Sequence, residues 1–205
     1  MGITTMNLFF ELKINDKNSL MFFIPSNVEE KLNYLFYPTE TINLFDEIMV
    51  VLKTDETALE LTQDSIEFTI GRLYRSLKDI FELPSMYTVG DVARLYNIDF
   101  YHEILEMCDL SESSLWNNQH TMTFLYSQYG KIYLDISPRY PWLSQELEEA
   151  KESNDFFPFE DYIRNYKPIK IYELSQETID QWRAQCSQFL KRVEKPTGLK
   201  DYDND

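Results

Sequence analysis

The chain has 205 residues, of which 43% are hydrophobic and 15% aromatic, and this composition excludes a disordered protein and predicts a substantial core. Its 19 Lys and Arg residues stand against 35 Asp and Glu residues, which gives a net charge of −16 at pH 7. This balance argues against binding of nucleic acid or anionic membranes, because both recruit cationic side chains, and it favours a basic partner.

The first residues, Met1-Gly2-Ile3-Thr4-Thr5, lack the basic start and the long apolar core of a signal peptide. No apolar run reaches the length of a membrane span. Cys108 and Cys186 lie in different segments, so we expect two reduced, buried thiols rather than a disulfide. Together these features predict a cytoplasmic protein.

Four strands are predicted in the N-terminal part of the chain. The runs Met6–Ile14 and Ser19–Ile24 are rich in β-forming residues, and the turn-forming segment 15–18 between them predicts a hairpin. Further strands are expected over Glu47–Lys53 and Ala58–Thr62.

Two helices are predicted in the same part. A short helix is expected over Val28–Tyr37, where Pro38 ends it. A longer one is expected over Asp64–Leu83, because Asp64 and Glu67 have the spacing of a capping box and apolar residues recur on one face.

The middle of the chain is acidic and predicted to be helical. Short helices are expected over Val89–Tyr96 and Asp99–Leu110, and no Lys or Arg occurs between Arg94 and Lys131. That interval holds a first acidic patch, which consists of Asp99, Glu103, Glu106, Asp109 and Glu112. A solvated surface and a binding surface are both compatible with such a patch.

A hairpin stands at the centre of the prediction. The turn Tyr129-Gly130 lies between two β-rich runs, Met122–Tyr126 and Ile132–Ile136. Gly130 is the residue that tolerates positive φ in a tight turn. The chain leaves through Tyr140-Pro141-Trp142. We expect this hairpin in the middle of a mixed, mainly antiparallel sheet.

A helix, a strand and a second helix are predicted after the central hairpin. A helix over Gln145–Ser153 carries a second acidic patch, and a last strand is expected over Ile169–Leu174. Ser175 precedes a final helix with one apolar face. The second acidic patch consists of Glu146, Glu148, Glu149 and Glu152.

The predicted fold is therefore α+β, with a mainly antiparallel sheet built from hairpins and flanked by amphipathic helices. We expect a single domain over residues 1–195 and an acidic, disordered tail over residues 196–205.

Catalytic chemistry finds little support in the sequence. Five scattered glycines form no phosphate-binding loop. His102 and Glu106 have helical i,i+4 spacing, but two ligands are too few for a metal site. Cys108 with His102 or His120 is a conceivable nucleophile and base, although a buried thiol is the commoner arrangement. We predict a protein without catalytic residues, cofactor or metal.

A resemblance points to a function. The segments FLYSQYGKIYLDISPRYPW and DYIRNYKPIKIYELS, with the final helix that bears Trp182, resemble small acidic immunity proteins. Bacteria encode such proteins beside secreted polymorphic or contact-dependent toxins. The resemblance covers about residues 120–193 and implies a non-enzymatic protein that binds its cognate toxin and occludes the toxin's active site.

Acidic and aromatic residues are the predicted contacts with the toxin. Carboxylates compete for the cationic cleft of a toxin that cleaves nucleic acid, and aromatic side chains supply desolvated anchors. Trp116, Tyr140 and Trp142 are the candidate anchors, and packing in the core is the alternative for each. The two acidic patches are the candidate charged contacts. Two other functions stay open: an acidic nucleic-acid mimic of the anti-defence type, and an adaptor or scaffold domain.

Overall fold

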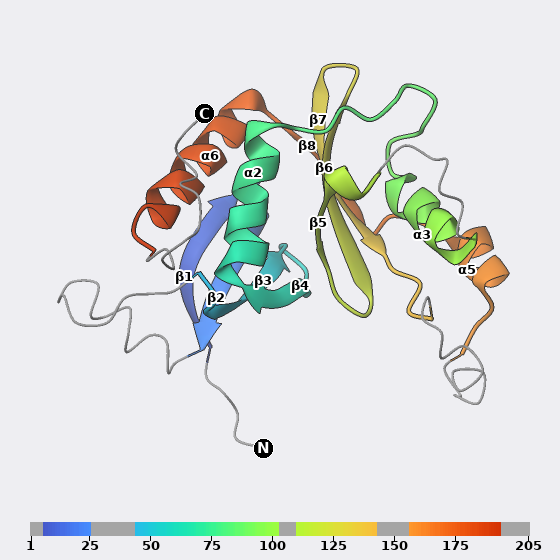
Figure 1. Cartoon of the computed structure of the whole chain (residues 1–205), viewed down its shortest axis with the longest axis horizontal. Helices are drawn as coiled ribbons and strands as arrows, with labels where there is room; N and C mark the ends of the chain where they lie inside the picture. The colour runs from blue at the N-terminus through green and yellow to red at the C-terminus, as the bar shows by residue number, and fades with distance from the viewer. Residues whose placement is uncertain (1–5, 26–43, 103–109, 143–155, 194–205) are drawn as a thin grey trace. The chain divides into compact units, whose positions relative to one another are not determined.

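The computed structural model describes residues 6–25, 44–102, 110–142 and 156–193. The chain divides into two compact units, shown in Figure 1, where we expected one domain over residues 1–195. Unit 1 comprises residues 1–78 and 177–205, and unit 2 comprises residues 79–176. Each unit has its own antiparallel four-stranded sheet, so the predicted α+β fold with antiparallel sheet built from hairpins is confirmed.

Unit 1 contains the four strands predicted in the N-terminal part of the chain. Its strands, in sheet order, are β1 (Met6–Lys13), β2 (Ser19–Pro25), β3 (Glu47–Lys53) and β4 (Ala58–Ser65). Burial alternates along β2, where Leu20, Phe22 and Ile24 are buried and the residues between them are half-buried. This period of two is what places one face of the sheet in the core.

The helix predicted over residues 64–83 forms only in part. β4 continues to Ser65, because Asp64 pairs with Ile48 in the sheet and therefore does not cap a helix. A wide π-helical turn, Glu67–Gly71, then leads into α2 (Arg72–Lys78).

The C-terminal helix α6 (Gln176–Leu190) completes unit 1. The indole Nε1 of Trp182 donates a 2.8 Å hydrogen bond to the Lys13 carbonyl at the end of β1. The Phe189 ring lies 5.1 Å from the Phe9 ring, centroid to centroid, and Figure 1 shows α6 beside β1. The predicted apolar face is buried at Ile179, Trp182, Cys186, Leu190 and Val193.

Unit 2 contains the predicted central hairpin. Its strands, in sheet order, are β5 (Ser114–Asn117), β6 (Thr121–Gln128), β7 (Lys131–Pro138) and β8 (Lys170–Leu174). Tyr129 and Gly130 both have positive φ, 53° and 75°, as a two-residue type I′ turn requires. The expected turn is present, and Tyr129 also adopts the left-handed conformation.

The helices of unit 2 differ from the prediction. One helix, α3 (Val92–His102), runs through the gap that we expected between two helices, and a 3₁₀ turn, Leu110–Ser113, precedes β5. The unpredicted helix α5 (Phe159–Asn165) lies between β7 and β8 in the chain. The helices predicted over 28–37 and 145–153, and the tail over 196–205, fall outside the described residues.

Among the described residues, no helix is both long enough and apolar enough to cross a membrane.

Candidate functional site

An aromatic cluster joins α3, α5 and the exit of β7 in unit 2. Tyr140, Phe159 and Tyr162 are buried at its centre. Tyr101 of α3 stacks on Phe159 of α5, with ring centroids 4.0 Å apart and an interplanar angle of 12°. We call this group, together with the half-buried Trp142, the aromatic cluster.

Polar groups fix the cluster in place. The Asn97 side chain donates to the Tyr162 hydroxyl at 3.1 Å, and its Oδ1 accepts from the Tyr140 backbone N–H at 3.3 Å. Tyr162 in turn donates to the Pro138 carbonyl at 2.8 Å, and Tyr140 donates to the Phe157 carbonyl at 3.1 Å. These bonds connect three segments that are far apart in the sequence. They therefore hold the aromatic cluster in one arrangement.

The predicted anchors are mostly internal. Trp116 and Tyr140 are 3% and 0% exposed, so both contribute to the core, and we remove them from the candidate contacts. Burial, with the nearby Tyr101 and Glu160, raises the pKa of Tyr140 to about 12. Trp142 is half-buried, and its ring centroid lies 6.0 Å from that of Phe156. Trp142 is therefore the one predicted anchor with partial exposure.

Only two of the predicted acidic residues can be placed. Asp99 is half-buried on α3, and Glu112 is exposed in the 3₁₀ turn before β5. The other predicted carboxylates lie outside the described residues: Glu103, Glu106, Asp109, Glu146, Glu148, Glu149 and Glu152.

The structure adds residues that the sequence prediction missed. Phe100 on α3 is 56% exposed and directly precedes Tyr101, and Phe157 is 38% exposed and lies two residues before Phe159, the ring on which Tyr101 stacks. Glu160 is exposed on the first turn of α5 and lies close enough to Tyr140 to influence its pKa. The dense aromatic and acidic segment 156–161 was the signal for these residues, but its exposed positions follow only from the helix that it forms.

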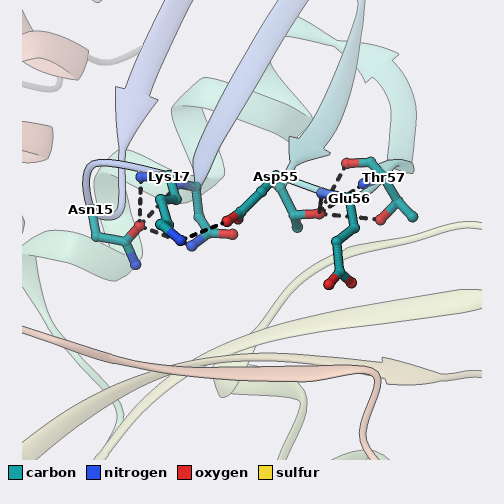
Figure 2. Close-up of polar contacts among 7 residues, drawn as sticks. Asn15, Lys17, Asp55, Glu56 and Thr57 are labelled. Atoms are coloured by element: carbon teal, nitrogen blue, oxygen red, sulfur yellow. Dashed lines mark hydrogen bonds and ion pairs between the residues drawn. The ribbon is translucent and has the colours of Figure 1, made fainter.

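A second polar cluster lies in unit 1 at the tips of two hairpins (Figure 2). Asn15 Oδ1 accepts the backbone N–H groups of Lys17 and Asn18 at 3.0 and 2.9 Å, which closes the β1–β2 turn. The ammonium of Lys17 pairs with Asp55 of the β3–β4 turn at 3.0 Å. These side chains are 73% and 48% exposed, so the pair aligns two turns and contributes little to stability.

The structure describes one of the two cysteines and the side chain of one of the two histidines. Cys186 is buried in α6, and burial raises the pKa of its thiol to about 12, so it is not an activated nucleophile. His120 is exposed, whereas Cys108 and the side chain of His102 are outside the described residues. The described residues contain no group of three or more His, Cys, Asp and Glu side chains arranged to hold a metal ion.

Comparison of the chain with protein-family models, with curated proteins and with solved structures gives no match in any of the three. The geometry of the aromatic cluster and the distribution of charge are therefore the basis for a functional proposal.

Proposed function

We propose that the protein is a non-enzymatic, cytoplasmic immunity protein that binds a basic toxin domain and neutralises it through acidic and aromatic contacts. Charge supports this proposal. Unit 2 carries 17 Asp and Glu residues against seven Lys and Arg residues, a net charge of −10, while unit 1 has 18 against 12, a net charge of −6. An excess of negative charge on one unit steers a cationic partner toward that unit.

The observation that carries the proposal is the exposure of Phe100 and Phe157 beside the aromatic cluster. Exposed rings on a rigid support bind at low entropic cost, because their backbone and neighbours are already fixed. Glu160 and the half-buried Asp99 add carboxylates next to the same rings. Glu160 is exposed and can meet a cationic partner directly, whereas the Oδ1 atom of Asp99 is buried.

The first experiment is a pull-down with the products of neighbouring genes at low and moderate salt. We expect one basic protein, bound in stoichiometric amount. Recovery of a nucleic-acid-binding host protein would favour the mimic function, and recovery of several unrelated proteins would favour an adaptor. An enzyme assay of the recovered partner, with and without this protein, then tests neutralisation.

Charge reversal tests the electrostatic part of the proposal. We expect Glu160→Lys to slow association with the basic partner several-fold and to flatten its dependence on salt, because carboxylates near an interface accelerate encounter. Glu56→Lys in the exposed β3–β4 turn is the matched control, since it changes the net charge equally but lies in unit 1. Equal effects of the two substitutions would mean that Glu160 acts only through the net charge of the protein and not through a position near the interface. The same reversal at Glu146, Glu148 and Glu149 tests the second acidic patch.

Truncation of the exposed rings tests the aromatic part. We expect Phe100→Ala and Phe157→Ala to accelerate dissociation of the complex, because anchor residues act mainly on the off-rate. Phe68→Ala is the matched control, since Phe68 is 54% exposed but belongs to unit 1. A partner that dissociates at the same rate from all three variants would remove this face from the proposed interface.

A further inference from the structure

A carboxylic acid is buried in the sheet of unit 2. Asp135 lies on β7, is 0% exposed, and stands opposite Phe124 on β6 and Ile171 on β8. Its Oδ2 lies 3.0 Å from the Tyr126 hydroxyl, and its Oδ1 lies 2.6 Å from the Ser137 hydroxyl. Buried carboxyl groups need partners for both oxygens, and Asp135 has them.

The partners of Asp135 lead back to a single residue. The Tyr126 oxygen accepts the Gly90 backbone N–H at 3.1 Å. On the other side, the Ser137 oxygen lies 3.0 Å from the Tyr166 hydroxyl, which lies 2.8 Å from the Gly90 carbonyl. Five oxygen or nitrogen contacts thus form a ring that begins and ends at the backbone of Gly90.

The ring requires one hydrogen for each of its five contacts. The Gly90 N–H and the hydroxyls of Tyr126, Ser137 and Tyr166 supply four hydrogens when Asp135 is ionised. Ser137 then donates to Asp135, and the single hydrogen of Tyr166 is donated either to Ser137 or to the Gly90 carbonyl. One of the five contacts is therefore left without a hydrogen. A proton on Asp135 supplies the fifth hydrogen: Asp135 donates to Ser137, Ser137 to Tyr166, and Tyr166 to Gly90.

We propose that Asp135 carries a proton in the folded protein, that this proton completes the ring of hydrogen bonds, and that folding of unit 2 therefore takes up one proton. The proposal is independent of the partner that the protein binds.

The charges around Asp135 agree with a protonated acid. Burial raises the pKa of Asp135 most, hydrogen bonds from Ser137 and Tyr126 lower it, and the nearby carboxylate of Asp91 raises it. Arg94 of α3 directs its guanidinium to Asp91, at 3.0 Å, and not to Asp135. Burial also raises the pKa of Tyr126 and of Tyr166, so both hydroxyls keep their hydrogens. From β8, the residue opposite Asp135 is the apolar Ile171.

The proposal fixes the sign of a pH effect. The pKa of Asp135 is raised in the folded state, so the folded protein holds a proton that the unfolded chain, with an ordinary carboxyl pKa of about 4, releases. Its contribution to stability is complete below that unfolded pKa and disappears as the pH rises through the folded pKa. Within this window the unfolding equilibrium constant rises by up to about tenfold per pH unit on account of this one group.

Asp135→Asn tests the proton directly. An amide donates to Ser137 and accepts from Tyr126, so it supplies the same hydrogens as the protonated acid at every pH. We expect the variant to fold and its unfolding constant, measured in urea, to lack the rise attributed to Asp135. A pH dependence identical to that of the natural protein overturns the proposal.

Tyr166→Phe separates the ring from burial alone. Without this hydroxyl three contacts remain, and Gly90, Tyr126 and Ser137 fill them while Asp135 is ionised, so we expect the pKa of Asp135 to fall. Loss of a polar neighbour by itself would leave that pKa unchanged or raise it. The measurement is a ¹³C carboxyl titration by NMR, in which the Asp135 signal is assigned by its absence from Asp135→Asn. A pKa in the range of the surface carboxylates in the natural protein, or a pKa that does not fall in Tyr166→Phe, overturns the proposal. If Tyr166→Phe does not fold, the comparison with Asp135→Asn decides alone.

Discussion

Gly90 and Gly130 of unit 2 both have positive φ, but a side chain added at Gly90 would also meet neighbouring atoms. Gly130 has φ of 75°, and a Cβ added there would meet no atom within 4 Å. At Gly90, with φ of 90°, an added Cβ would lie 2.8 Å from Ile171 Cδ1 and 3.0 Å from Pro168 Cγ. We expect Gly130→Ala to reduce the free energy of unfolding by about 1 kcal/mol, through backbone strain alone. Gly90→Ala adds a steric conflict of about 1–3 kcal/mol to that strain.

Urea denaturation of both variants measures the difference. Equal losses would mean that the residues around Gly90 move aside without cost. Sequence patterns identified Gly130, because a glycine between two β-rich runs is a local signal, but Gly90 owes its importance to Pro168 and Ile171, which are distant in the chain. For the same reason the sequence left both an exposed and a buried Tyr140 open, since its burial depends on the return of α5.

At the scale of elements, local pattern predicted the strands better than the helices. β3 has the predicted bounds, Glu47–Lys53, although its register with β4 shifts between Val50 and Val51. The helix predicted from Asp64 starts late because sheet pairing of Asp64 and Ser65 overrides their local helix signal. The helix α5 was missed although Pro158 at its N-cap, Glu160 and Asp161 in its first turn and Arg164 in its last turn are start and stop signals.

The attachment of α6 to β1 gives a prediction at this scale. Trp182→Phe removes the indole that donates to the Lys13 carbonyl and leaves a gap around a smaller ring. We expect the free energy of unfolding to fall by about 1–3 kcal/mol, from the lost hydrogen bond and the gap together. Circular dichroism in urea is the measurement, because the substitution removes a fluorophore. Gln188→Ala, at an exposed position of α6, is the control and should change stability by less than about 0.5 kcal/mol. A loss no larger than that of the control would show that Trp182 does not fasten α6.

At the scale of the whole molecule, the order of elements in the chain differs from their grouping in space. Unit 2 is one continuous stretch, residues 79–176, which contains its whole sheet, the aromatic cluster and the hydrogen-bond ring of Asp135. Unit 1 is assembled from both ends of the chain, as the blue strands and the red helix α6 show in Figure 1. Sequence patterns alone suggested one domain because no linker of Gly, Pro or Ser separates the two units.

This grouping predicts which fragments fold. A protein of residues 79–176 keeps all strands of its sheet and the buried core of Leu83, Val92, Phe124 and Tyr126, so we expect it to give dispersed NMR signals and a cooperative thermal transition. A protein of residues 1–78 keeps its four strands but lacks α6, so the Lys13 carbonyl loses its indole donor and Phe9 loses the Phe189 ring. We expect that fragment to remain unfolded alone and to gain structure when a peptide of residues 177–193 is added. An unfolded 79–176 fragment would contradict the division into two units, and a folded 1–78 fragment would show that the sheet of unit 1 does not depend on α6.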